Sequence, residues 1–383
     1  MSGISEDPAA RAALAGVEST AAEPGLDPPR RAAPSASPGL AHELFDGGIE
    51  DVPESVRQAA LALVEYGDLA PAPVAERTTR GPVRVHVPLT PLGTAQARGE
   101  EANGRVEPGG RVTEVWTSTE PAERWRVGRV ELASTSDWTF GAVHVDEADL
   151  ERDVAATYDD VLASLEGARH PHLVRMWNVL SDINRTHGPV IEGLDRYMGF
   201  CRARSLAFER HHGGAFARRL SAASAVGGAD GPLVVYFLAR AAPGESFGNP
   251  RQEEAFRYPT RYGPRPPSFA RATRVAWGPG AGASHLFVSG TASIVGSESV
   301  HLDDYPAQLL ETERNLEAVA VQARADVMDA PWSLKVYLKD ARDLDRTRMH
   351  LRDTFGPNAP MLFLHADVCR DELAVEIEAI VSL

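Results

Sequence analysis

One order of structural elements occurs twice in this sequence, and such a repeat restricts the possible folds more than any other feature. From about residue 110, the apolar patterns predict strands, then a helix, a buried strand, a second helix and two further strands. The same order returns from about residue 272 to the C-terminus. The helices of the two copies are expected at residues 147–168, 194–212, 303–325 and 343–356. The sequence therefore predicts an internal duplication of one mixed α/β (α+β) unit.

The two copies differ at one position that matters for chemistry. Aligning the last strand of each copy puts Tyr236 where the second copy has Glu376. Side chains alternate along a strand, so Glu376 and Glu378 share one face of it. On an edge strand, these two acids would simply form a solvated face. The flanking segments are strongly apolar, however, and burial would raise the pKa of a carboxyl group enough for it to donate a proton near neutral pH.

The 383 residues exceed one typical domain of roughly 100–200 residues, so at least two units are expected. Residues 1–40 are rich in Ala, Pro, Ser and Gly without an apolar period, which predicts a disordered leader. Residues 41–245 are predicted to form the N-terminal unit, and residues 246–383 the C-terminal unit that carries the acid. Within the first unit, a short helix is expected at residues 55–64 and a strand from Pro82.

Charge and composition exclude several classes of function. The chain has 39 Lys and Arg against 54 Asp and Glu, and the resulting net charge of -15 argues against nucleic-acid binding. No stretch approaches about 20 apolar residues and no signal pattern opens the sequence, so no membrane association is expected. Cys201 and Cys369 are the two cysteines, which fits a cytoplasmic protein. Since Lys335 and Lys339 are the two lysines, a site for an anion would use arginine.

The segment between the copies, residues 247–272, alternates arginines with aromatic rings. A solvated connector with proline-set turns explains this composition as well as a ligand-binding segment does. Tyr258 and Arg271 belong to this segment. Tyr197 and Arg204 lie two turns apart on a predicted helix, a spacing that also fits a core tyrosine with a surface arginine. If the two arginines converge on one pocket, each could hold one carboxylate of a dianionic ligand.

Small residues and histidines give further signals. The run of small residues at 289–293, which includes Gly290, indicates a close backbone approach to either a packed helix or a ligand. Four histidines occur in two pairs that lack metal-site spacing, so we expect no metal. Neither cysteine lies in a pattern typical of a nucleophile.

Seven blocks of the sequence carry a resemblance to a known family. They are RMWNVLSDIN (175–184), DRYMGFCRARSLAF (195–208), SAASAVGG (221–228), NPRQEEAFRYPTRYGPRPPSFARA (249–272), LFVSGTASIVGSESVH (286–301), QLLETERNL (308–316) and ADVCRDELAVEIEAI (366–380). In this order the blocks resemble the chorismatase family, over about residues 110–383.

The resemblance implies a fold, a reaction and a set of site residues. The fold would be two tandem YjgF-like (chorismate mutase-like) units forming a pseudo-oligomer, and the reaction would cleave pyruvate from chorismate without a metal or redox cofactor. Tyr197, Arg204, Tyr258 and Arg271 match the substrate-binding positions of the family. Glu376 matches its catalytic acid, which would protonate the enolpyruvyl group.

The resemblance also bears on the product. Some chorismatases hydrolyse chorismate to a dihydroxycyclohexadiene carboxylate, and others form 3-hydroxybenzoate. Gly290 and Cys369 are similar to the pair found in 3-hydroxybenzoate formers, so we expect 3-hydroxybenzoate and pyruvate, with the hydrolase as the alternative. A non-catalytic binder of aromatic or keto acids is an alternative of another class. The duplication predicts a monomer, and the resemblance a role in secondary metabolism such as antibiotic biosynthesis.

Overall fold

The computed structural model describes residues 40–67, 80–95, 105–107, 109–186, 194–276, 283–324 and 330–383. All of them belong to one compact unit. The predicted leader lies outside the described residues except for Leu40, which is buried. Within the described ranges, no helix is long and apolar enough to cross a membrane.

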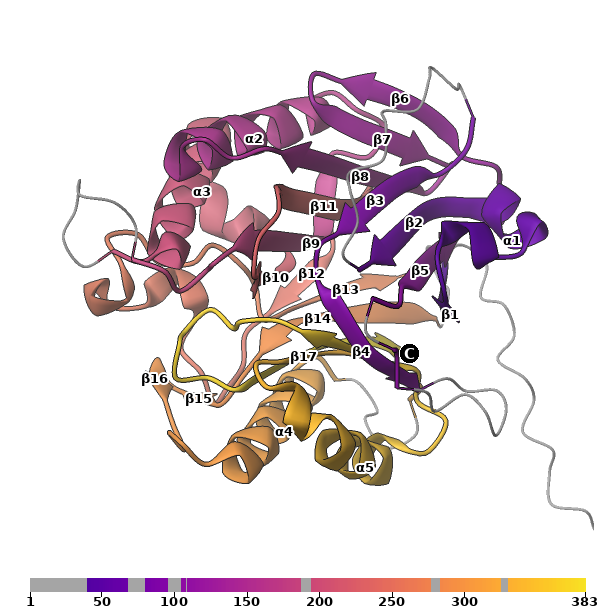
Figure 1. The fold of residues 1–383 in the computed structure, drawn as a ribbon. Coiled ribbons are helices and arrows are strands. Elements are labelled where there is room, and N and C mark those ends of the chain that lie inside the picture. Colours follow the sequence, from indigo (N-terminus) through magenta and orange to yellow (C-terminus); the bar gives the residue numbers. More distant parts are fainter. Residues whose placement is uncertain are drawn as a thin grey trace, which may run out of the picture. The chain divides into compact units, whose positions relative to one another are not determined.

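Three sheets form the framework of the chain (Figure 1). The first runs β1-β5-β2-β3, and its strands are β1 (Ala41–Asp46), β2 (Ala60–Tyr66), β3 (Val83–Val87) and β5 (Val112–Thr117). The second runs β10-β9-β11-β8-β7-β6, and its strands are β6 (Glu123–Val127), β7 (Val130–Ser134), β8 (Trp138–Val145), β9 (His172–Ser181), β10 (Ala222–Gly228) and β11 (Leu233–Arg240). The third runs β12-β13-β14-β19-β17-β18-β4, and its strands are β4 (Thr90–Ala95), β12 (Glu245–Phe247), β13 (Ala272–Ala276), β14 (Ser284–Thr291), β17 (Trp332–Leu338), β18 (Met361–His365) and β19 (Val375–Ser382).

Helices and short connecting elements complete the fold. The α-helices are α1 (Glu54–Ala59), α2 (Leu150–Leu165), α3 (Arg196–His212), α4 (Tyr305–Gln322) and α5 (Leu344–Phe355). The 3-10 helices are η1 (Ile49–Asp51), η2 (Gly213–Arg219), η3 (Ala255–Arg257), η4 (Thr260–Tyr262) and η5 (Ala341–Asp343), and a small ribbon pairs β15 (Ile294–Val295) with β16 (Glu298–Ser299).

The strand pairing confirms the internal duplication. In the second sheet β9 pairs in parallel with β10 and antiparallel with β11, and in the third β17 pairs likewise with β18 and β19. Tyr236 lies opposite Trp177, as Glu376 lies opposite Tyr337, in agreement with the alignment of the copies. The first sheet repeats this pairing: β2 pairs in parallel with β3 and antiparallel with β5, and β5 also pairs antiparallel with β1. The structure thus adds a third, shorter copy that the sequence pattern did not reveal.

Each long helix covers the outer face of one sheet (Figure 1). Apolar residues of α2 and α3 form one core with the second sheet, and those of α4 and α5 form another with the third sheet. The inner faces of all three sheets contribute to a common central core. Along β19, Val375 and Ile377 face the helices, so Glu376 and Glu378 face inward, and both acids are buried.

One local prediction was wrong. The helix expected at residues 55–64 ends at Ala59, and the apolar residues that follow form strand β2. Every residue of β2 is buried because one face of the strand joins the central core and the other packs against Ile49 and Val52, and a strand buried on both faces shows no alternation. A short apolar run of this kind has no period that distinguishes a strand from a helix.

Candidate active site

Six of the seven predicted site residues line one pocket. They are Tyr197, Tyr258, Arg271, Gly290, Cys369 and Glu376. These residues come from the start of α3, the segment that joins the two copies, β14, the loop before β19, and β19 itself. The segment at residues 247–272 is therefore part of a pocket wall, and the alternative of a purely solvated connector is wrong.

Two acids line this pocket, Asp195 and Glu376, and Glu376 is the more deeply buried. Its side chain is only 4 % exposed. Burial, together with the negative charge of Glu378, raises the pKa of Glu376 to about 8, although Arg175 and Arg271 oppose the shift. At neutral pH the carboxyl group is thus mainly protonated and able to donate a proton.

Gly290 permits the position of this carboxyl group. The pairing of β14 with β19 shifts register between Val288 and Thr291, so Gly290 lies in a β-bulge beside Glu376. A Cβ atom at Gly290 would overlap Oε1 of Glu376. The close approach predicted from the small residues is therefore an approach to the carboxyl group of the candidate acid.

Arg271 and Tyr258 form a cationic and aromatic wall of the pocket. Nη2 of Arg271 donates to the Tyr258 hydroxyl and to the carbonyl of Glu253, both at 2.7 Å. The guanidinium also lies 5.2 Å from the ring centre of Phe269. Arg271 is only 5 % exposed and forms no ion pair with any described residue, so it can receive an anionic group.

Tyr197 and Cys369 add neutral polar groups. Tyr197 follows Asp195, whose side chain caps α3 by accepting the Met198 N–H at 2.7 Å. Burial raises the pKa of the Tyr197 phenol well above its ordinary value. Burial also raises the pKa of the Cys369 thiol, as does the nearby Glu376. A thiol held neutral in this way is a poor nucleophile, so Cys369 contributes shape to the pocket.

Arg204 is not among the residues that line this pocket, and its predicted contact with substrate stays a prediction. Its Nη1 donates to the carbonyl of Ser268, and its guanidinium lies 5.0 Å from the ring centre of Phe208. Seven residues along a helix separate it from Tyr197 by about 10 Å, so the two side chains reach different places. Arg204 instead holds the segment that carries the pocket wall.

Comparison with known proteins shows which family the chain resembles. The family model for the N-terminal part of FkbO/Hyg5-like chorismatases matches residues 114–239. A 3-hydroxybenzoate synthase of Streptomyces hygroscopicus is 34% identical over 282 residues, which cover 70% of this chain and 81% of that protein. A chorismatase of Streptomyces rapamycinicus is 35% identical over 283 residues, covering 70% and 82%. The chain belongs to the chorismatase family.

A solved structure extends the match to the fold. The crystal structure of a chorismatase superposes with a TM-score of 0.72 and 30% identity, covering 91% of this chain and 100% of that one. The tandem α/β fold expected for a chorismatase is thereby confirmed. The match to named enzymes also favours catalysis over the alternative of a non-catalytic binder.

A second arginine of the chorismatase pocket was missed in the sequence. Arg370 lines the pocket, and its guanidinium lies 3.8 Å from the ring centre of Tyr262 and 5.3 Å from that of Tyr258. Its Nη1 donates to the carbonyl of Ser297 at 2.9 Å. Together with Arg271, it gives the pocket two cations around one tyrosine. Arg370 directly follows Cys369, a predicted site residue, and this neighbourhood was the one sequence signal that could have identified it. A single arginine in a loop shows no spacing or periodicity that predicts a binding role.

A network of buried charges lies behind the pocket. Glu378 accepts hydrogen bonds from Arg175 Nη2 at 2.6 Å, Ser224 Oγ at 2.6 Å, Trp177 Nε1 at 2.7 Å and the Tyr337 hydroxyl at 3.0 Å. Lys335 lies 3.3 Å from Glu378 and 2.9 Å from Glu114. Burial alone would raise the pKa of Glu378, but the charges of Arg175 and Lys335 outweigh it and hold that pKa below its ordinary value. Two acids two residues apart are therefore held in different protonation states, a common mark of an active site.

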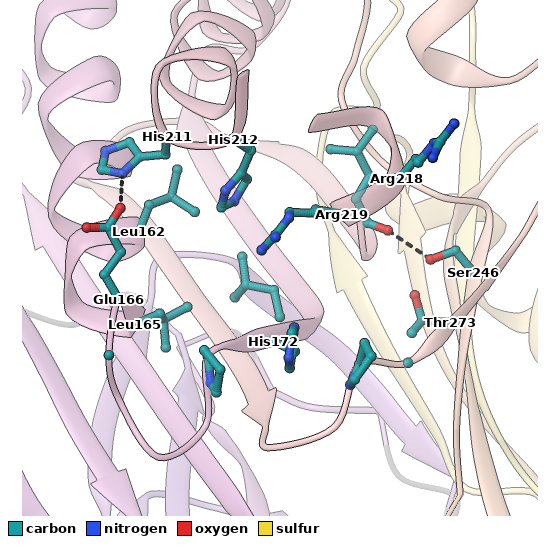
Figure 2. Close-up of a pocket in the computed structure, with 16 residues that line it drawn as sticks. Leu162, Leu165, Glu166, His172, His211, His212, Arg218, Arg219, Ser246 and Thr273 are labelled. Atoms are coloured by element: carbon teal, nitrogen blue, oxygen red, sulfur yellow. Dashed lines mark hydrogen bonds and ion pairs between the residues drawn. The ribbon is translucent and has the colours of Figure 1, made fainter. Parts of the chain in front are cut away.

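A larger cavity lies elsewhere in the chain and lacks such chemistry (Figure 2). It has a volume of about 720 Å³, and Figure 2 shows His172, His212 and Arg219 around it. Its lining acid, Glu166, is exposed and lies 2.8 Å from His211. Burial and the charge of Arg219 lower the pKa of both His172 and His212, which leaves these imidazoles neutral. The pocket around Glu376, rather than this cavity, has the groups required for acid catalysis.

Proposed function

We propose that this chain converts chorismate to 3-hydroxybenzoate and pyruvate. The observation that carries the proposal is the buried Glu376, which is protonated at neutral pH and lies in a pocket with Arg271 and Arg370. One relative in the family is named as a 3-hydroxybenzoate synthase, which supports the choice of product. Gly290 and Cys369, which line the same pocket, support it further.

Chorismate is a dianion with a ring carboxylate and an enolpyruvyl carboxylate. The guanidinium groups of Arg271 and Arg370 can each hold one of them, with Tyr197 and Tyr258 as phenolic donors. Glu376 then transfers its proton to the enolpyruvyl methylene carbon, which forms a C–H bond and leaves an oxocarbenium-like carbon next to the ether oxygen. The bond between the ether oxygen and the ring carbon then breaks, and pyruvate leaves with that oxygen as its keto group. The neighbouring ring hydroxyl moves to the vacated ring carbon as its own C–O bond breaks, and one ring proton returns to the Glu376 carboxylate, which gives the aromatic 3-hydroxybenzoate. The two products together contain the atoms of chorismate, so this reaction consumes no water, whereas the hydrolase alternative consumes one molecule.

Replacement of the proton donor tests the reaction. The Glu376→Gln variant removes the acidic proton and keeps the shape of the side chain, so pyruvate release should fall by at least about a thousandfold, within the range that acid catalysis contributes. Chorismate binding, measured by calorimetry, should persist. Glu317→Gln is the matched control, because Glu317 is exposed on α4. Turnover by Glu376→Gln at the rate of the unaltered protein would contradict the assignment.

Chromatography of the reaction mixture tests the product. We expect equal amounts of pyruvate and 3-hydroxybenzoate. A dihydroxycyclohexadiene carboxylate in place of the phenolic acid would support the hydrolase alternative. Unchanged chorismate after prolonged incubation would contradict both reactions.

A further inference from the structure

The charged groups that act on Glu376 include an arginine that the proposed reaction has not yet used. Arg175, on β9, is only 2 % exposed. Its Nη2 donates to Ser224 Oγ and to Glu378, both at 2.6 Å. Its Nη1 is buried and has no hydrogen-bond partner among the described residues. One arm of the guanidinium is thus fixed, and the other is free.

Ser224 links this arginine to the candidate acid. Its hydroxyl oxygen accepts the backbone N–H of Gly290 at 2.9 Å and donates to Glu378 at 2.6 Å. A Cβ atom built at Gly290 would lie 3.1 Å from Ser224 Oγ and would overlap the Glu376 carboxyl group. The Ser224 hydroxyl and the Glu376 carboxyl group therefore lie on the same side of Gly290, with Arg175 one hydrogen bond beyond.

An unpartnered N–H in a buried guanidinium is unfavourable, so such a group is expected to have a partner in some state of the protein. While Glu376 keeps its proton, it carries no negative charge to attract this group. Proton transfer to substrate breaks the O–H bond of Glu376, forms the C–H bond of the methylene carbon and leaves the electron pair on the carboxylate. That buried negative charge then requires a donor.

We propose that Arg175 is a positioning residue whose free Nη1 group receives the Glu376 carboxylate formed by proton transfer, while Glu378 and Ser224 hold its other arm. The inference rests on the proposed function of Glu376. It assigns a role to the buried network behind the pocket, which otherwise contains two acids and two cations without an evident purpose.

The charges around Glu376 support this arrangement. Among the groups that lower the pKa of Glu376, Arg175 has a larger effect than Arg271, and Glu378 acts in the opposite sense. The titratable groups that face Glu376 are Glu378 on its own strand, Arg175 on β9, Arg271 before β13, Tyr197 on α3, Tyr337 on β17 and Cys369 in the loop before β19. The pKa values of the two phenols and the thiol are raised by burial, so these groups stay neutral where Glu376 titrates.

Two substitutions with opposite expected effects test the proposal. Removing the cation in Arg175→Met should raise, by about one unit, the pH above which kcat/KM falls (the alkaline limb of the profile). It should also lower kcat at least tenfold. Removing the neighbouring negative charge in Glu378→Gln should move the same limb downward. A structural role alone would reduce activity without moving the limb in opposite directions. If kcat/KM fell at the same pH in both variants and in the unaltered protein, the proposal would be overturned.

Further variants keep the test decisive. Arg175→Lys keeps the positive charge. The pH at which kcat/KM falls should therefore lie nearer to that of the unaltered protein in Arg175→Lys than in Arg175→Met. If Glu378→Gln fails to fold, Ser224→Ala replaces it: this variant removes one of the two contacts that fix the arm of Arg175 and should lower kcat with little change in KM. Unchanged kcat in Ser224→Ala would count against the proposal.

A measurement independent of turnover separates this inference from the proposed function. Infrared titration of protein with isotope-labelled glutamate, with Glu376→Gln to assign the signal, gives the protonation of Glu376 directly. An upward shift in Arg175→Met would support the placement of Arg175 even in a protein inactive on chorismate. Activity on chorismate with no shift would refute the role of Arg175 and leave the proposed function intact.

Discussion

At the scale of single residues, the site depends on contacts too short to tolerate additional atoms. Gly290 lies in a bulge where even one methyl group would overlap the Glu376 carboxyl group. Glu376 itself differs from Glu378 in protonation state because their partners differ: Arg175 and Lys335 hold the charge of Glu378, while burial dominates at Glu376. The chemistry of two identical side chains is thus set by their neighbours.

The pH dependence of activity follows from the state of Glu376. The protonated form is the active form, and its pKa is raised to about 8. Activity should therefore be constant below this pKa and fall about tenfold per pH unit above it, because the acid loses its proton. The chorismate carboxylates titrate far lower and do not interfere. Chromatographic assay of kcat/KM from pH 6 to about pH 10 measures the limb, and a flat profile would exclude Glu376 as the acid.

Substitution of Gly290 tests the close approach. Gly290→Ala should displace the Glu376 carboxyl group and lower kcat at least tenfold, with a loss of stability of about 1–3 kcal/mol from overpacking. Gly214→Ala is the control, since a Cβ atom there meets nothing within 4 Å. Steady-state kinetics and thermal unfolding measure the two effects. Full activity in Gly290→Ala would show that the carboxyl group can relocate.

At the scale of elements, the pocket is assembled by segments that the duplication leaves irregular. The segment joining the copies forms two short 3-10 helices, and its end brings Arg271 next to Tyr258. Helix α3 contributes Tyr197 at its first turn, whereas Arg204, two turns later, supports Ser268 of the joining segment. One helix thus lines the pocket at one end and holds its wall at the other.

The two arginines should therefore respond differently to lysine. Arg271→Lys removes the two-pronged guanidinium donor that lines the pocket. The KM for chorismate should therefore rise about tenfold or more, the effect expected when one charge-assisted hydrogen bond is lost. Arg204→Lys should instead destabilise the fold by about 1–3 kcal/mol, because the buried carbonyl of Ser268 loses its donor, and should change KM little. Kinetics and urea unfolding of both variants measure the difference. A larger effect on KM in Arg204→Lys would place Arg204 at the substrate.

At the scale of the whole molecule, charges from all three sheets meet in the centre. Glu114 comes from the first sheet, Arg175 from the second, and Lys335 and Glu378 from the third. Their contacts join segments more than 200 residues apart in sequence. The same contacts lie directly behind the pocket, so packing of the sheets and the state of the acid are coupled.

The two lysines of the chain provide a matched test of this network. Lys335→Met leaves two buried carboxylates without their shared cation and should lower the free energy of unfolding by about 3–5 kcal/mol. Lys339→Met breaks a partly exposed pair with Asp371 and should change it by less than about 1 kcal/mol. Adding Glu114→Gln to Lys335→Met should restore part of the loss. Urea unfolding measures all three, and equal effects of the two lysines would contradict a central ionic network.

The sequence by itself determined the duplication, the four long helices, most strands and the burial of Glu376. Those features depend on periods of two or 3.6 residues, which are local and survive in the sequence pattern. The third copy of the unit, which the first sheet forms, escaped notice because its buried strand β2 has no such period. The roles of Arg204 and Arg370, and the meeting of Arg175 with Glu378, were decided only by the tertiary structure. These contacts join distant segments, and no local pattern encodes where two distant side chains meet.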